Sequence, residues 1–280
     1  MYEVEYVALS HSGRIRRINQ DNFYVNGFYK KNAQHPEAYF EGSNSTGKFL
    51  AAVCDGMGGE EMGEIASLLA VQVIAEMDKA TEKISLWERN RADFLSDITR
   101  MANQTICNRM KEEGKTMGST LSMLEFCGNK VRACNLGDSR IYQLTNKELK
   151  KISTDHTVIQ RLLQHGQITS EEAKNHPMQH RITQYLGIPM EEMILEPAIT
   201  GWIPLVRDDI FVICSDGLTD MLSEKQIADC LLEETTLCRQ GIKLQQSALH
   251  AGGNDNITVI LIKVGRSITL LERWKEKFCN

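Results

Sequence analysis

The chain has 280 residues, of which 42% are hydrophobic and 25% charged, and its formal net charge is −5. These fractions are ordinary for a globular protein, and the acidic balance argues against a nucleic-acid binder, which normally has a basic surplus. The first residues do not combine a basic region with an apolar block, and no apolar run approaches the roughly 18 residues that span a bilayer. We therefore expect a cytoplasmic protein with no membrane or nucleic-acid partner.

In the first half of the chain, short apolar runs precede two stretches in which apolar residues recur at helical spacing. The predicted strands cover 3–9, 21–28 and 48–54. The polar segment 29–47 between them is expected to form a surface loop or an extended hairpin. The predicted helices cover 62–80 and about 88–113.

The second of these helices has a predicted apolar face and a predicted end. Phe94, Ile98, Met101 and Ile106 are expected to face inward. Gly114 follows the basic last turn, as is typical of a helix stop.

The second half returns to short apolar runs. Four of them between 119 and 153 are separated by turn-forming residues and predict an antiparallel meander. Further elements are expected in this order: helical 155–176, a strand at 208–217, helices near 223–234 and 238–250, and a strand at 256–264. This order indicates an α+β fold, and with no linker in sight we expect one domain over 1–280.

The cysteine pattern favours reduced thiols. There are eight cysteines and none form a C-x-x-C pair. Cys54, Cys134 and Cys214 lie in apolar strand-like runs, where a thiol usually serves as a small hydrophobe. A disulfide framework is not expected in a chain of this length without an export signal.

Several aspartates stand beside glycine or another small residue at the edge of an apolar run: Asp21 in NQDNF, Asp55 in CDGMGG, Asp138 in LGDSR, Asp216 in CSDGL and Asp255 in GGNDNITV. A single Asp-Gly is more often a simple turn. Several carboxylates at strand ends can converge on one cleft, where they repel each other unless cations neutralise them. Because the ligands are all oxygen, the pattern favours Mg²⁺ or Mn²⁺ over zinc or copper.

Eight sequence blocks, in this order, carry a resemblance to a known family: GRIRRINQD (13–21), DGMGGEEMGEIAS (55–67), MGSTLSML (117–124), NLGDSRIY (135–142), STDHT (153–157), HPMQHRITQYLG (176–187), CSDGLTDML (214–222) and GGNDNITV (252–259). Together they resemble the metal-dependent serine/threonine protein phosphatases of type 2C, particularly the compact bacterial ones. The resemblance implies a central β-sandwich of two antiparallel sheets flanked by pairs of α-helices. It also implies a metal centre at one end of the sandwich.

The resemblance further implies roles for residues in two core metal sites. Asp55 should bridge two ions, and the Gly56 carbonyl should bind the second. Asp216 and Asp255 should hold the first ion. Either Mn²⁺ or Mg²⁺ is expected.

Four more residues match positions around this core. Asp138 and Asp220 match the family's looser site for a third ion. Asp21 should hydrogen-bond metal-bound water, and Arg16 should clamp the substrate phosphate through a bidentate fork. Arg16 and Asp55 are the residues that we expect to be catalytic.

The implied reaction is hydrolysis of phosphoserine and phosphothreonine on proteins, reversing Ser/Thr kinase signalling. Two cations bridged by a carboxylate can share a water, lower its pKa and aim it as hydroxide at phosphorus. Phosphorylated proteins are the expected partners, and the family is usually monomeric. Two alternatives stay open: a specialised phosphatase of one regulatory phosphoserine protein, of the anti-sigma antagonist type, and a pseudophosphatase that only binds.

Two departures from the family pattern bear on the chemistry. Gln20 stands where the family usually has glutamate, which predicts weaker binding of the second metal. Met57 stands where animal members have a histidine proposed as general acid, and methionine cannot donate a proton. His156 and His176 are the candidate donors, although a lone histidine is more often a structural hydrogen-bonder.

Three remaining segments have weaker interpretations. Glu60, Glu61 and Glu64 begin a predicted helix and complement its dipole, with a supporting role near the metals left open for Glu64. Residues 157–176 fall where the family has a variable flap, for which substrate gating is a hypothesis from analogy. The tail from 267 is expected to form a short amphipathic helix that packs on the domain.

Overall fold

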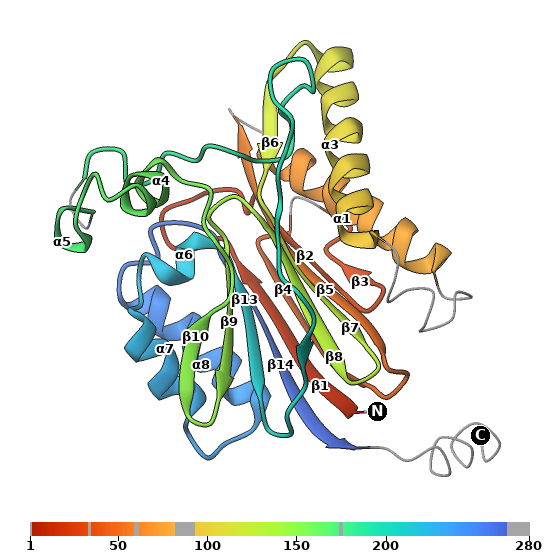
Figure 1. Ribbon diagram of the computed structural model, residues 1–280, viewed down its shortest axis with the longest axis vertical. Helices are drawn as coiled ribbons and strands as arrows, with labels where there is room; N and C mark the ends of the chain where they lie inside the picture. The colour runs from red at the N-terminus through yellow and green to blue at the C-terminus, as the bar shows by residue number, and fades with distance from the viewer. Residues whose placement is uncertain (1, 33–34, 59–61, 82–92, 174–175, 268–280) are drawn as a thin grey trace.

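The computed structural model of the chain describes residues 2–32, 35–58, 62–81, 93–173 and 176–267. Within them, two antiparallel sheets pack face to face, and helices cover the outer face of each sheet (Figure 1). This arrangement confirms the predicted α+β sandwich. In the described part of the chain, no helix is long and apolar enough to cross a bilayer.

The first sheet has six strands in the spatial order β10 (Glu148–Lys151), β9 (Arg140–Thr145), β13 (Ile210–Cys214), β14 (Ile257–Ser267), β1 (Tyr2–His11) and β4 (Glu37–Asn44). β1 lies between β14 and β4, so the first described strand pairs with the last one. β4 corrects the prediction for 29–47, which left open a loop or a hairpin. Its side chains are mostly exposed, so its composition is polar and hides the strand.

The second sheet has the spatial order β11 (Ala198–Ile199), β8 (Lys130–Leu136), β7 (Leu121–Cys127), β5 (Lys48–Gly58), β2 (Asp21–Val25) and β3 (Phe28–Tyr29), with β12 (Ile203–Pro204) beside β8 and β6 (Met117–Ser119) beside β5. β5 continues beyond the predicted 48–54, because β6 pairs with Gly56, Met57 and Gly58. The segment DGMGGEEMGEIAS, which begins at Asp55, is therefore strand in its first four residues, 55–58.

The predicted meander over 119–153 is wrong at its middle step. β7 pairs with β8 and β9 pairs with β10, but β8 and β9 belong to different sheets. The turn at Gly137, Asp138 and Ser139 carries the chain from one sheet to the other. Gly137 has φ 110°, and a Cβ there would lie 2.7 Å from the Thr120 Cγ2 atom. Asp138 is thereby placed where the two sheets meet.

Helices α1 (Gly63–Ala80) and α3 (Phe94–Glu113) cover the second sheet (Figure 1). α3 ends as predicted at Gly114, which has φ 64° and donates its N–H to the Met110 carbonyl. Its predicted inward residues are buried with one exception. Met101 is 38% exposed, because Ala102 continues the buried stripe in its place.

Helices α7 (Glu224–Leu231) and α8 (Leu237–His250) cover the first sheet. The segment predicted as helical at 155–176 contains α4 (Val158–Gln164) and α5 (Ser170–Ala173), which project from the sandwich in Figure 1. A short helix, α6 (Asp216–Thr219), follows β13 directly. The predicted tail helix, and Glu60 and Glu61, lie outside the described residues.

Aromatic rings from both sheets fill the space between them. Phe126 of β7 contacts Phe49 of β5 and Phe211 of β13, with ring centroids 5.4 and 5.6 Å apart. Seven of the cysteines are described and free, and Cys54 and Cys134 are among the fully buried ones, as expected of reduced thiols. The apolar interior holds the strands in register, so polar residues at their ends have fixed positions.

Candidate metal centre

Four predicted aspartates lie at one end of the sandwich and come from both sheets. Asp55 of β5 and Asp21 of β2 are directly paired across neighbouring strands. Asp216 follows β13 and begins α6, and Asp255 precedes β14. β13 and β14 are also neighbours. Each sheet therefore places the carboxylates of one pair of neighbouring strands at the same end of the sandwich.

A cleft of about 250 Å³ brings the predicted residues together, lined among others by Arg16, Asp55, Gly56, Asp138, Asp216 and Asp255. Asp21 is fully buried behind them. Asp220 follows α6 as its C-cap and lines an adjacent cavity together with Asp138 and Asp216. All eight predicted site residues therefore lie in or beside one cavity system.

The glycines beside the aspartates permit contacts that no side chain would allow. A Cβ on Gly56 would lie 2.0 Å from the Gly63 carbonyl oxygen, and one on Gly217 would lie 2.0 Å from that of Asn256. These contacts hold the start of α1 against β5 and the start of α6 against β14. Glycine here fixes how closely the acidic segments approach one another.

Several carboxylate oxygens are buried without a partner among the described residues. Ser215 donates its hydroxyl to Asp21 Oδ2 at 2.7 Å, but Asp21 Oδ1 accepts no hydrogen bond. Asp138 Oδ1 and Glu64 Oε2 are also buried and unpartnered. Glu64 lies in the first turn of α1 as expected, yet it is 6% exposed, so its carboxylate points into the protein. Buried acceptors of this kind are what a cation would satisfy.

Burial and mutual repulsion raise the pKa values of the clustered carboxyls. Burial is the larger cause for Asp55 and Asp216, whose pKa values lie well above the ordinary range, and the neighbouring aspartates add to it. Burial also raises the pKa of Asp21 and of Asp138 to about 6. An all-oxygen set that is this costly to ionise fits Mg²⁺ or Mn²⁺, whose charge would offset the repulsion.

Arg16 lies at the mouth of the cleft. Its Nη2 atom is 2.7 Å from Asp255 Oδ2, and its side chain is 56% exposed. Gly13, with φ 78°, lets the preceding loop pass so close that a Cβ would lie 2.2 Å from the Asp255 carbonyl oxygen. The guanidinium is thus held beside the carboxylates while its remaining N–H groups face solvent.

Sequence reasoning missed several supporting residues. The Asn256 side chain accepts from the Gln20 N–H at 2.8 Å and donates to the Ser12 and Ile18 carbonyls, so it shapes the loop that carries Arg16. The buried Lys30 ammonium donates to the Asn19 carbonyl at 2.9 Å, and burial lowers its pKa to about 8. Asn256 lies within the GGNDNITV block, but nothing in the sequence marks Lys30.

Both candidate histidines make structural hydrogen bonds. His156 Nδ1 accepts from the Gly137 N–H at 3.2 Å, and His176 Nδ1 accepts from the Met178 N–H at 3.2 Å. A third histidine, His180, lines the main cleft and the adjacent cavity. Its only sequence signal is its place in the block HPMQHRITQYLG.

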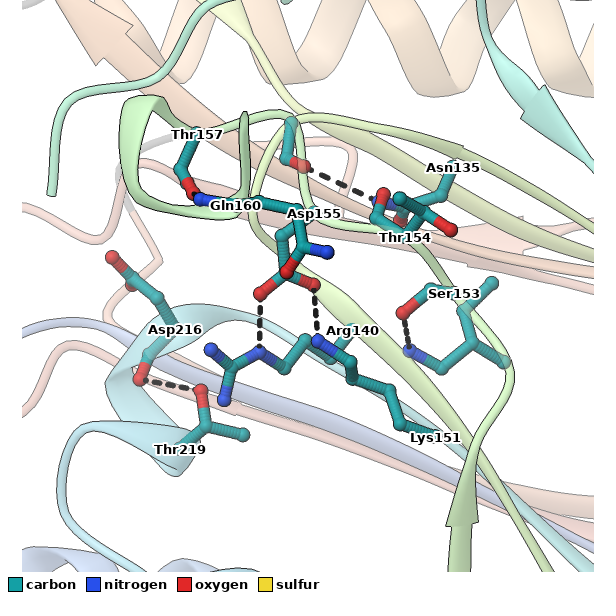
Figure 2. Close-up of polar contacts among 12 residues, drawn as sticks. Asn135, Arg140, Lys151, Ser153, Thr154, Asp155, Thr157, Gln160, Asp216 and Thr219 are labelled. Carbon is teal, nitrogen blue, oxygen red and sulfur yellow. Dashed lines mark hydrogen bonds and ion pairs between the residues drawn. The ribbon is translucent and has the colours of Figure 1, made fainter. Parts of the chain in front are cut away.

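The wall of the adjacent cavity is a hydrogen-bonded network (Figure 2). Asp155 accepts from Arg140 Nε at 2.9 Å and from Lys151 Nζ at 3.1 Å. Thr157 caps α4 by accepting the Gln160 N–H at 3.1 Å. Both cationic side chains are therefore held on Asp155, which fixes the base of the 157–176 segment beside α6.

The model of the family protein phosphatase 2C matches residues 37–247 of this chain. The chain belongs to the protein phosphatase 2C family. Protein phosphatase PhpP of Streptococcus pneumoniae is 32% identical over 264 residues, which cover 93% of this chain and 98% of that protein.

Solved structures agree with this assignment to protein phosphatase 2C. The serine/threonine phosphatase of S. agalactiae has a TM-score of 0.80 and 32% identity, covering 93% of this chain and 99% of that one. The catalytic domain of the serine/threonine protein phosphatase PstP, in complex with two manganese ions, has a TM-score of 0.76 and 30% identity over 95% of this chain and all of that one. The similarity thus spans nearly the whole chain.

Proposed function

We propose that this protein phosphatase 2C hydrolyses phosphoserine and phosphothreonine on proteins in a metal-dependent reaction. The observation that carries the proposal is the convergence of Asp55, Asp216 and Asp255 on one cleft with Arg16 at its mouth. Relatives of matching length are named protein phosphatases or serine/threonine phosphatases, and one was solved with two manganese ions. Loss of the family's metal-binding aspartates would mark a pseudophosphatase, and Asp55, Asp216 and Asp255 are all present at the matching positions.

The proposal assigns two core ions to the central residues. Asp55 would bridge both ions, Asp216 and Asp255 would complete the first site, and the Gly56 carbonyl would contribute to the second. Burial of Asp55 and Asp216 with raised pKa values supports this assignment, since such carboxylates favour a bound cation over solvent. Mn²⁺ or Mg²⁺ would fill the sites, and when bound they supply the Lewis acidity that lowers the pKa of water.

The remaining residues would orient the reactants. Asp21, held by Ser215, would accept a hydrogen bond from water in the cleft through its free oxygen. Arg16 would hold two phosphoryl oxygens through its exposed N–H groups, while Asp255 fixes its position. A third, looser site would use Asp138 and Asp220.

The wider proposal concerns domain and partners. Residues 1–280 would form one catalytic domain, with 157–176 as a flap beside the cleft. Phosphorylated proteins would be the substrates, particularly those of a Ser/Thr kinase in the same cytoplasm, and the enzyme would act as a monomer. A specialised role toward one regulatory phosphoserine protein is the alternative.

The test is hydrolysis of a phosphothreonine peptide while Mn²⁺ is titrated into metal-free protein. We expect turnover to appear with Mn²⁺, to vanish with EDTA, and to fall by at least about 10³-fold in Asp216→Asn, because the core site loses a ligand. Asp229→Asn, on the far helix α7, is the matched control and should keep full activity. Wild-type protein that binds Mn²⁺ without turnover would contradict the proposal and favour a binding module.

A further inference from the structure

A cavity of about 270 Å³ lies between α4, α5 and α6, next to the main cleft. Its lining includes Asp138, His180, Asp216 and Asp220. The two cations of its wall, Arg140 and Lys151, are bound to Asp155, as Figure 2 shows. Among the residues that the structure describes, neither of these two cations forms an ion pair with Asp138, Asp216 or Asp220.

His180 meets two aspartates at the edge of this cavity. One potential ligand atom from each of His180, Asp216 and Asp220 lies within 4.8 Å of the others, the only such cluster in the described ranges. His180 Nδ1 is 3.6 Å from Asp220 Oδ2. These separations suit three ligands around one ion that would draw them slightly together.

A second observation also points to a cation here. Asp138 lines the same cavity and is only 8% exposed, yet its Oδ1 atom has no hydrogen-bond partner among the residues described. A buried carboxylate oxygen without a hydrogen-bond donor is costly unless it binds a cation or water. Asp138 therefore adds a buried carboxylate to the wall of the cavity that His180, Asp216 and Asp220 also line.

The backbone fixes the position from which His180 reaches the cavity. Just after it, Arg181 accepts the Val158 N–H at 2.9 Å, and Ile182 bridges to Thr157. The start of α4 is thereby tied to the strand-like segment that carries His180. A ligand at this point would connect the 157–176 segment to the metal centre.

We propose that His180 supplies a nitrogen ligand, together with Asp216, Asp220 and Asp138, to a site for a divalent transition metal of the Zn²⁺ or Mn²⁺ kind. Imidazole suits these ions, whereas Mg²⁺ prefers oxygen and keeps its waters. The inference builds on the third ion of the proposed function and gives that site a chemistry different from the all-oxygen core. His180 would then determine which divalent metal this third site prefers.

The experiment uses ring-¹⁵N-labelled histidine in the full chain, with core sites kept in saturating Mg²⁺ near pH 7.5 while Zn²⁺ is added. We expect the change from metal-free to Mg²⁺-saturated protein to leave the His180 ring resonance in place, and Zn²⁺ then to shift it. His180→Gln identifies this resonance, because it is missing from the spectrum of that variant. Calorimetry in the same buffer should show Zn²⁺ binding weakened by about tenfold or more in His180→Gln. His165→Gln, an exposed histidine at the end of α4, is the control and should bind Zn²⁺ like wild type.

Three outcomes would overturn the inference: no shift of the His180 resonance with Zn²⁺, unchanged Zn²⁺ affinity in His180→Gln, or an equal response to Mg²⁺. If His180→Gln instead altered the acid limb of the pH–rate profile without changing Zn²⁺ binding, His180 would be a proton donor rather than a ligand. Peptide hydrolysis reports separately on the proposed function. Turnover without a Zn²⁺ shift rejects only this site, whereas a shift without turnover rejects only the phosphatase assignment.

Discussion

At the scale of single residues, Gln20 is the departure with the clearest surroundings. Its carbonyl accepts from the Gly56 N–H at 3.2 Å and from the Ser67 hydroxyl at 2.6 Å. Its side chain packs against Gly63, where a Cβ would lie 2.7 Å from Gln20 Cδ. The backbone is fixed on both sides, so the neutral amide lines the cleft close to Asp55.

Gln20→Glu should strengthen binding of the second metal ion. A carboxylate at this position adds one negative charge beside the cleft, worth about 1 kcal/mol, and lowers the Mn²⁺ dissociation constant by about fivefold. Mn²⁺ calorimetry measures this, with Gln246→Glu on the exposed side of α8 as a control for net charge. Equal Mn²⁺ affinity in Gln20→Glu and wild type would show that position 20 does not tune the site.

The sequence predicted the acidic residues of this site far better than their neighbours. Asp55 and Asp216 follow long apolar runs, so their strand-end positions can be inferred directly. His180 follows no such run, and its approach to Asp220 depends on how the chain returns from α5. The sequence also gives no sign that Lys30 is buried, because a buried lysine has the same local pattern as an exposed one.

At the scale of elements, the site depends on short pieces packed at glycine contacts. α6 has four residues, and its start touches the start of β14 through Gly217 and Asn256. This contact sets the separation of Asp216 from Asp255. A one-turn helix has little stability of its own, so its position comes from this packing.

Gly217→Ala should weaken both Mn²⁺ binding and folding. The added Cβ would lie 2.0 Å from the Asn256 carbonyl oxygen, so α6 must move away from β14, at a cost of about 1–3 kcal/mol. We expect Mn²⁺ affinity to drop by about tenfold in calorimetry, with a lower denaturant midpoint. Gly201→Ala is the matched control, since a Cβ there meets nothing within 4 Å. Similar behaviour of the two variants would argue against a spacing role for Gly217.

Elements were predictable from the sequence when burial gave them a pattern. β5 and β14 are continuous apolar runs, and α3 ends at a glycine. β4 was not predicted, because an exposed edge strand has polar residues. α6, β11 and β12 are too short to show a hydrophobic period. The passage from β8 to β9 between sheets could not be inferred, since both strands are apolar and the pattern does not specify which sheet each joins.

At the scale of the whole molecule, the site gathers acidic groups that oppose folding when no cation is present. In the folded chain Asp21 and Asp138 have pKa values of about 6, above the ordinary 3.8. Between these values the folded protein binds more protons than the unfolded chain. The contribution of these two carboxyls to the free energy of unfolding is therefore complete below about pH 4 and is lost as the pH rises through 6.

Asp138→Asn should gain stability relative to wild type as the pH rises from 5 to 7.5 in EDTA. The amide keeps the shape of the carboxyl but cannot ionise, and the gain should be on the order of 2 kcal/mol. Saturating Mn²⁺ should reverse the order at pH 7.5, because only the carboxylate binds the cation well. Denaturant unfolding with and without Mn²⁺ measures the difference in stability between Asp138→Asn and wild type under both conditions. A pH-independent difference in EDTA would mean that Asp138 ionises freely in the fold.

The pairing of β1 with β14 has a consequence for synthesis in the cell. β1 leaves the ribosome more than two hundred residues before its partner strand β14, Ile257–Ser267. The ion pair between Arg16 and Asp255 likewise joins residues that are 239 positions apart. A chain interrupted before this point lacks β14, so β1 keeps only its pairing with β4 and the cleft lacks Asp255. We therefore expect no phosphatase activity until Asp255 and β14 have been synthesised.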